Sequence, residues 1–182
     1  ERIALLDEAA AAQMWIGTFH AFGLELLRLY AVQAGLRGNF DVFDEARCLG
    51  LLEDLLPHLK LRHFQNLWDP SLELRPILRA ISRAKDELVG PAEYLAAAED
   101  ALAAGGPPDV VEAAEKAVEV GGVYKVYQDA LHAMGAVDFG DLVGKAAQLL
   151  TDHAGVRATV RDRYRWILVD EYQDVNAAST AM

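Results

Sequence analysis

The chain has 182 residues, of which 53% are hydrophobic and 25% are charged, and its formal net charge is −11. This balance is typical of a globular domain and excludes a disordered, low-complexity chain. No apolar run approaches the length of a membrane span, the acidic N-terminus does not resemble a signal peptide, and the single cysteine excludes an internal disulfide. We therefore expect a protein of a reducing compartment, the cytoplasm, without contact with a membrane.

The acidic charge is concentrated in one stretch. Residues 91–122 hold seven acidic side chains and one basic side chain, so they supply −6 of the total −11. The rest of the chain is only mildly acidic. A local basic face for nucleic acid is compatible with this distribution, whereas non-specific coating of DNA is not.

The first part of the chain combines helical and extended patterns. The Ala- and Leu-rich stretch 1–12 is consistent with a helix, and the short apolar run 14–18 predicts a buried strand. Apolar residues at helical spacing predict a helix over 19–34, which Gly35 would end. The segment 40–43 is a short extended piece.

Helical patterns dominate from Asp44, a candidate N-cap, to residue 163. Gly, Pro and Asp residues mark most of the helix ends. We expect helices at 44–57, 72–89, 92–104, 110–134, 138–150 and 156–163. Within the longest of them, Gly121 and Gly122 mark the weakest point. A second apolar run, 166–169, then predicts another buried strand.

The two predicted strands bracket a long helical middle. Two strands alone do not make a stable sheet, so we expect the remaining strands to lie outside this sequence, which opens without Met inside an apparent helix. The economical interpretation is one part of an α/β nucleotide-binding domain, with a helical subdomain inserted between its strands.

Two carboxylates, Asp170 and Glu171, directly follow the second predicted strand. In open parallel sheets, ligands bind outside the carboxyl ends of the strands. At such a place Asp170 could bind Mg²⁺ through water, and Glu171 could accept a proton from the water that attacks a γ-phosphate. Gln173 could sense the nucleotide or join it to a DNA site, and Asp174 and Asn176 could cap the next helix. The structural alternative is a buried strand that runs into an acidic turn.

The string Val-Asp-Glu-Tyr-Gln-Asp-Val-Asn at 169–176 resembles motif II, the Walker B region, of the UvrD/Rep/PcrA family of superfamily 1 DNA helicases. Three more segments resemble this family and occur in its order: Trp-Ile-Gly-Thr-Phe-His-Ala-Phe at 15–22, Ile-Ser-Arg-Ala-Lys-Asp-Glu-Leu at 81–88 with Pro91 and Tyr94, and Asp-Phe-Gly-Asp-Leu at 138–142. The resemblance covers essentially the whole chain, and agreement at four motifs in order exceeds chance.

The resemblance implies a role for each matching position. Asp170 would be the Mg²⁺ ligand and Glu171 the catalytic base, with Gln173 also at the ATP site. Thr18, Phe19 and His20 would lie on the path of single-stranded DNA. This placement suits their chemistry, because a hydroxyl can donate to a phosphate oxygen and the two rings offer flat faces for bases.

Several of these positions have a structural alternative. Thr18 could be an N-cap, and Phe19 could be a core residue, as we expect for Phe22. Asp138 and Asp141 have the spacing of an N-cap with an acidic first helical turn, and for them we favour this structural role. The chain also departs from the family pattern, with Ala21 where Ser is frequent, Val175 where Thr is frequent, and Gly140 in place of an acid.

The family fold would be a RecA-like α/β P-loop NTPase, of which this chain would hold a fragment. Residues 1–35 would belong to the motor domain. Residues 36–155 would form the inserted, mostly α-helical subdomain, and residues 156–182 would return to the motor domain with the Walker B strand. A few parallel strands would accompany the helices.

Arg75, Arg79 and Arg83 are spaced by four residues on one face of a predicted helix. In the family, the inserted subdomain lies near duplex DNA ahead of the junction, so these arginines could bind backbone phosphates. The alternative is a solvated helix face paired with acids such as Glu87. A second basic cluster comprises His58, Lys60, Arg62 and His63.

The resemblance implies that the parent protein is an ATP-dependent DNA helicase in repair, replication or recombination, with ATP and Mg²⁺ as cofactors and single-stranded DNA and the duplex junction as partners. The chain contains no Gly-Lys-Ser/Thr phosphate loop, so by itself it should bind ATP poorly and be inactive. One alternative is the helicase part of a recombination helicase-nuclease subunit. Another is a non-catalytic relative that uses its acidic 91–122 segment to dock proteins.

Overall fold

The computed structural model describes residues 14–59, 61–64 and 71–182. Its helices are α2 (Phe19–Leu29), α3 (Glu45–Leu55), α4 (Ser71–Asp86), α5 (Pro91–Ala104), α6 (Pro108–Met134), α7 (Phe139–Asp152), α8 (Ala154–Arg163) and α9 (Ala177–Ala181). Two 3₁₀ turns, Leu56–His58 and Tyr172–Asp174, complete the helical structure. All six helices expected from residue 44 onwards are present, whereas the one expected at 1–12 lies outside the described residues.

Local signals explain where these helices begin. Asp44 precedes α3 in an extended conformation, and its carboxylate accepts a hydrogen bond from the backbone N–H of Arg47 at 2.9 Å. This is the N-cap predicted from the sequence. Pro91 occupies the first turn of α5, where its missing N–H needs no partner.

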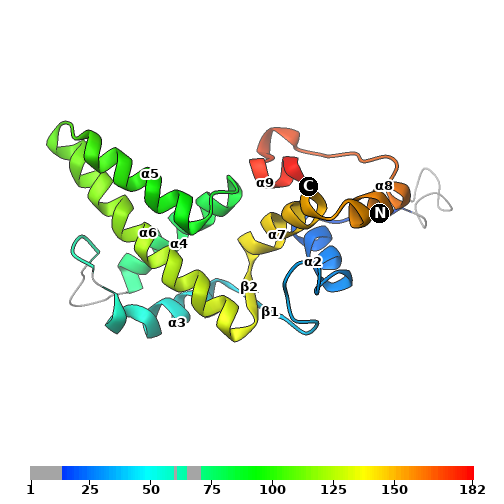
Figure 1. The fold of residues 1–182 in the computed structure, drawn as a ribbon, viewed down its shortest axis with the longest axis horizontal. Coiled ribbons are helices and arrows are strands. Elements are labelled where there is room, and N and C mark those ends of the chain that lie inside the picture. The colour runs from blue at the N-terminus through cyan, green and yellow to red at the C-terminus, as the bar shows by residue number, and fades with distance from the viewer. Residues whose placement is uncertain (1–13, 60, 65–70) are drawn as a thin grey trace.

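A two-stranded parallel sheet joins two lobes. Strand β1 (Asp41–Phe43) pairs with β2 (Ala136–Asp138), with Asp41 opposite Ala136 and Phe43 opposite Asp138. Figure 1 shows the sheet between the α5–α6 end of the molecule and the end formed by α2, α7 and α8. The extended piece at 40–43 is thus confirmed. The sequence did not predict β2, because three residues are too short to show an alternating pattern.

The two buried strands predicted at 14–18 and 166–169 are wrong for this structure. Both segments lack regular secondary structure, and Ile16 is 65% exposed, Trp166 92% and Leu168 90%. A strand needs a neighbour for its N–H and C=O groups and a layer to cover its apolar face. No strand in the described part of the chain pairs with either segment.

Each lobe has its own hydrophobic core. One lobe contains α3, α4, α5 and α6 and is called the helical lobe. In its core, Leu52 of α3, Ile77 and Ile81 of α4, and Tyr127 of α6 are fully buried together. In the other lobe, the core joins α2, α7 and α8, whose buried members are Leu26, Leu27, Leu142, Ala146, Leu149, Leu150 and Val156. Phe40 and Val137, which flank or belong to the sheet strands, extend the second core towards the first.

Cys48 lies in the core of the helical lobe, as its spacing predicted, and is 3% exposed. Within the described residues, no helix is both long and apolar enough to cross a membrane.

Candidate functional site

The acidic motif forms an exposed turn between the 166–169 run and α9. Glu171 has φ 50° and ψ 43°, a left-handed conformation that is rare for a residue with a side chain. The Asp170 Oδ1 atom accepts a hydrogen bond from the Glu171 N–H at 2.9 Å, and the Gln173 side-chain amide donates to the Glu171 carboxylate. Such strain costs about 1–3 kcal/mol and is concentrated at functional sites.

The acidic turn supplies some of the oxygen ligands that a hard divalent cation needs. Asp170 and Glu171 supply carboxylate oxygens and are both exposed, so a ligand can reach them. Among the described residues, no group of three or more His, Cys, Asp or Glu side chains could hold a metal ion. Mg²⁺ at this turn would therefore complete its coordination with water and phosphate oxygens, as it usually does beside a nucleotide.

Asn176 fixes the end of the acidic motif. Its side-chain Oδ1 accepts from the Ser179 N–H at 2.8 Å and so caps α9. Its Nδ2 donates to Asp86 Oδ1, at the end of α4, at 2.7 Å. The sequence predicted that Asp174 and Asn176 cap the next helix, and in the structure the N-cap of α9 is Asn176. The bond to Asp86 was not predicted, because it depends on the tertiary approach of α9 to α4.

The motif at the start of α2 combines structural and exposed side chains. Thr18 is the N-cap of α2, and its Oγ1 accepts from the Ala21 N–H at 3.2 Å. Phe22 is half-buried and packs against the core of α2, α7 and α8, with edge-to-face contacts to Trp15 and Tyr164 at centroid distances of 5.1 and 5.2 Å. The hydroxyl of Thr18 remains exposed and can still donate a hydrogen bond.

The two neighbours of Thr18 in this motif differ in exposure. Phe19 is half-buried, whereas His20 is exposed and its ring lies 5.8 Å from the ring of Phe139, at the start of α7. Phe139 is itself 53% exposed. The two exposed rings form an aromatic surface at the junction of α2 and α7.

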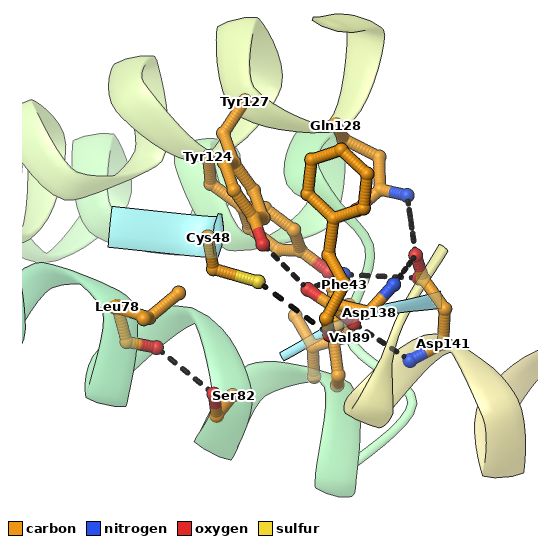
Figure 2. A network of polar contacts seen from close by, with 11 residues as sticks. Phe43, Cys48, Leu78, Ser82, Val89, Tyr124, Tyr127, Gln128, Asp138 and Asp141 are labelled. Atoms are coloured by element: carbon orange, nitrogen blue, oxygen red, sulfur yellow. Dashed lines mark hydrogen bonds and ion pairs between the residues drawn. The ribbon is translucent and has the colours of Figure 1, made fainter. Parts of the chain in front are cut away.

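The motif at 138–142 is a buried structural site. Asp138 caps α7 by accepting from the Asp141 N–H at 2.9 Å, and Asp141 accepts in return from the Asp138 N–H at 3.3 Å. Figure 2 shows the Tyr127 hydroxyl pointing to Asp138 and the Gln128 amide pointing to Asp141, at 2.9 and 3.1 Å. Burial, and then the Asp138 charge, raise the pKa of Tyr127 far above its ordinary value. The structural role favoured from the spacing is confirmed.

Lys85 also belongs to this buried site, although no pattern in the sequence indicates it. It is 6% exposed, and its Nζ lies 2.7 Å from Asp138 Oδ2 and 3.0 Å from Asp141 Oδ1. A side chain at Gly140 would place its Cβ 2.8 Å from the Lys85 Cδ. The departure from the family pattern at Gly140 therefore leaves room for the buried lysine.

The three arginines of α4 are exposed but not equivalent. Arg75 forms an ion pair with Glu45 of α3 at 2.7 Å. For Arg79 and Arg83, no ion pair is recorded with any described residue, so the predicted pairing with Glu87 is not formed. These two arginines line a hollow of about 550 Å³ beside α5, together with Glu87, Val89 and Tyr94.

The second basic cluster contacts acidic side chains of α6. His63 Nε2 lies 3.0 Å from Glu115, and the backbone N–H groups of Arg62 and His63 donate to Glu119 at 2.9 to 3.2 Å. His58 is exposed, and Lys60 lies outside the described residues. The acids that hold this cluster belong to the acidic 91–122 stretch.

Comparison with known proteins gives a match over the whole length of the chain. The sequence model of the family described as "UvrD/REP helicase N-terminal domain" matches residues 1–182. The chain is 34% identical over 179 residues to the ATP-dependent DNA helicase PcrA of Leuconostoc citreum, covering 98% of this chain and 21% of that protein. It is 28% identical over 176 residues to the ATP-dependent DNA helicase Rep of Escherichia coli, covering 95% of this chain and 23% of Rep. The chain thus spans about a fifth of the length of these curated relatives.

Proposed function

The chain belongs to the UvrD/REP helicase N-terminal domain family, and on this basis we propose that it is part of an ATP-dependent DNA helicase. The intact protein would couple ATP hydrolysis to movement along single-stranded DNA and to unwinding of the duplex. The observation that carries the catalytic part of this proposal is the exposed, backbone-strained Glu171 next to Asp170.

In the proposed ATP site, three side chains of the acidic turn have separate roles. Asp170 holds Mg²⁺ through water, and this ion neutralises phosphate charge when it is bound. Glu171 takes the proton from the attacking water. Gln173 donates a hydrogen bond to the Glu171 carboxylate and so orients it. A glutamine that already contacts the base is well placed to report the state of the nucleotide.

The DNA-binding part of the proposal rests on exposed and half-buried side chains of two lobes. Thr18, Phe19 and His20 contact single-stranded DNA, with the His20 and Phe139 rings as a surface on which bases can stack. Arg79 and Arg83 bind phosphates of the duplex, which is supported by the absence of a recorded ion pair for either side chain among the described residues.

We also propose that the lobe of α2, α7 and α8 belongs to a RecA-like motor domain. The bounds 36–155 for the inserted subdomain remain a prediction. The core that α2 and α7 share favours an inserted subdomain that ends near β2, before residue 155, because Leu142 and Leu149 pack with Leu26 and Leu27.

Substitution of the proposed base in the full-length protein tests this function. Glu171→Gln keeps the size of the side chain and removes its ability to accept a proton, so we expect DNA-stimulated ATP turnover to fall by about 10²–10⁴-fold. Glu99→Gln, a change at an exposed acid of α5, is the matched control and should leave turnover unchanged.

Two results would contradict the proposal. Turnover that survives Glu171→Gln would remove this residue from catalysis. An unmodified full-length protein without ATP turnover, in the presence of DNA, would favour a non-catalytic relative. The chain alone, which has no Gly-Lys-Ser/Thr loop, should show no robust turnover.

A further inference from the structure

The hollow between α4 and α5 combines groups of three chemical kinds. Its volume of about 550 Å³ lies within the range of roughly 300–1,000 Å³ that is usual for ligand sites. Arg79 and Arg83 supply guanidinium groups, Tyr94 supplies a ring and a hydroxyl, and Glu87 supplies a carboxylate. The apolar part of the lining comes from Pro76, Ala80, Ala84 and Val89. The hollow can therefore receive an anionic group and a flat apolar body together.

Two arginines give the hollow its positive charge. Arg79 and Arg83 are exposed, and no ion pair with a described residue is recorded for either side chain. Arg75, one turn earlier on the same helix, is instead held by Glu45 at 2.7 Å. Because Arg79 and Arg83 stand one helical turn apart on one face of α4, they can contact neighbouring phosphates of one strand.

Tyr94 differs from the neighbouring Tyr124, although their rings are in contact. The ring centroids lie 6.3 Å apart at an interplanar angle of 83°, an edge-to-face arrangement. The Tyr124 hydroxyl donates to the Val89 carbonyl at 3.2 Å, whereas no hydrogen bond with a described residue is recorded for the Tyr94 hydroxyl. Tyr94 is half-buried, so its ring is held by its neighbours and also lines the hollow. A fixed ring of this kind is a surface on which a base can stack.

Glu87 indicates which kind of anion suits the hollow. Its exposed carboxylate lies in the same lining as the two arginines and disfavours an acidic peptide. A carboxylate can accept a hydrogen bond from the amino group of a base such as cytosine. A nucleotide therefore suits all three kinds of group. Two arginines favour a nucleotide within a strand over a free mononucleotide, because a strand has a phosphate on each side of the base.

We propose that this hollow binds the first unpaired nucleotide of a strand at the duplex junction, an inference that rests on the proposed helicase function. The base stacks on Tyr94, and Arg79 and Arg83 contact the phosphates of the strand where it leaves the duplex. A base that occupies the hollow is withdrawn from its partner base. The hollow would thus oppose the re-pairing of a junction that the helicase has opened.

A photochemical cross-link tests whether a base lies against Tyr94. The probe is forked DNA with 5-iodocytosine, placed in turn at each unpaired position next to the junction on both strands. On irradiation, the iodinated ring forms a bond to an aromatic side chain that touches it. Mass spectrometry of the digested full-length protein then locates the attached residue. We expect residue 94 to be the main site for one of these positions, and we expect no attachment there of free 5-iodocytidine monophosphate at the same concentration.

Three variants separate a contact with the base from a purely structural role of Tyr94. Tyr94→Phe keeps the ring and should keep the cross-link. Tyr94→Leu should abolish the cross-link and weaken fork binding by at least about fivefold, the lower end of what stacking on one ring contributes. Ala80→Leu fills the hollow without changing Tyr94 or either arginine, and it should have the same two effects. Tyr30→Leu, at a half-buried tyrosine of the lobe of α2, α7 and α8, is the matched control and should change neither quantity.

Three results would overturn the proposal. They are fork binding without a cross-link at residue 94 from any position, equal labelling of residue 94 by the free nucleotide, and a cross-link and fork affinity that Ala80→Leu leaves unchanged. The third result, together with a lowered thermal unfolding midpoint in Tyr94→Leu, would assign Tyr94 to the core alone. Failure of the helicase function would be distinct, because the unmodified protein would then show neither fork binding nor DNA-stimulated ATP turnover.

Discussion

Lys85 shows how much a single buried charge contributes to this fold. Its ammonium lies between two carboxylates, Asp138 and Asp141, and all three side chains are at most 8% exposed. We expect Lys85→Met to destabilise the protein by about 3–5 kcal/mol, because it leaves two buried like charges without a cation. Denaturant unfolding measures this loss. Lys125→Met, which breaks the exposed pair with Asp129, is the control and should cost less than about 1 kcal/mol. Equal costs for the two variants would contradict the expectation.

Cys48 should be unreactive in the folded protein. Burial raises the pKa of its thiol, so the thiolate that reacts with alkylating agents is scarce even at mildly alkaline pH. We expect iodoacetamide to modify Cys48 at pH 8 only at the rate at which the protein unfolds, and rapidly once denaturant is added. Mass spectrometry of the intact protein follows the reaction. Fast modification without denaturant would show that the site opens.

The acidic turn and the buried network illustrate what sequence can predict about single residues. Asp170 and Glu171 stand out because their chemistry is concentrated in one contiguous string. Lys85 and Asp86 do not, because their partners lie 53 and 90 positions further along the chain. The ion pair of Lys85 and the hydrogen bond of Asp86 exist only after α4, α7 and α9 have packed, so no local pattern indicates either contact.

At the level of elements, the paired glycines of α6 have opposite roles. The helix runs unbroken through them, so the expected weak point does not interrupt it. A Cβ at Gly121 would lie 3.0–3.2 Å from Leu95 of α5, including its backbone, whereas a Cβ at Gly122 would meet nothing within 4 Å. The close packing of α5 on α6 therefore requires Gly121, and Gly122 is free to change.

This difference predicts opposite effects of two equal substitutions. Gly122→Ala should stabilise the protein by about 0.5–1 kcal/mol, because alanine loses less backbone freedom in a helix. Gly121→Ala should destabilise it, because the α5–α6 pair has to move apart to accept the methyl group. The midpoints of denaturant unfolding for the two variants provide the comparison. If Gly121→Ala stabilises the protein, Leu95 can move away from the added methyl group at little energetic cost.

The helices were predictable from the sequence, whereas of the extended segments only the piece at 40–43 was, and one physical reason explains this difference. A helix such as α7 satisfies its own backbone and shows its buried face at a fixed period, with Asp138 marking its start. A strand is completed by its neighbours. The runs 14–18 and 166–169 have the composition of buried strands, yet they have no partner among the described strands, while β2 forms because Asp41–Phe43 lies alongside it.

For the whole molecule, the charge pattern predicts how DNA binding responds to salt. Arg79 and Arg83 have no recorded ion pair among the described residues, whereas Arg75 is held by Glu45. In the full-length protein, Arg79→Ala and Arg83→Ala should each reduce the slope of log binding constant against log salt concentration by about one. Arg75→Ala should change it less. Fluorescence anisotropy with a junction DNA at several salt concentrations measures these slopes, and equal slopes for all variants would exclude phosphate contacts.

The parallel pairing of β1 with β2 has a consequence for the order of folding. The paired residues are 95 positions apart, and closing such a loop costs about 4 kcal/mol of chain entropy. The α5–α6 hairpin, in contrast, forms from contacts between neighbours in the chain and should assemble early. During synthesis, α2 emerges before the other described helices, but its apolar face must wait for Leu142 and Leu149 of α7. This helix is therefore made early and covered late, and its exposed face is a place where a nascent chain of this protein is open to aggregation or to a chaperone.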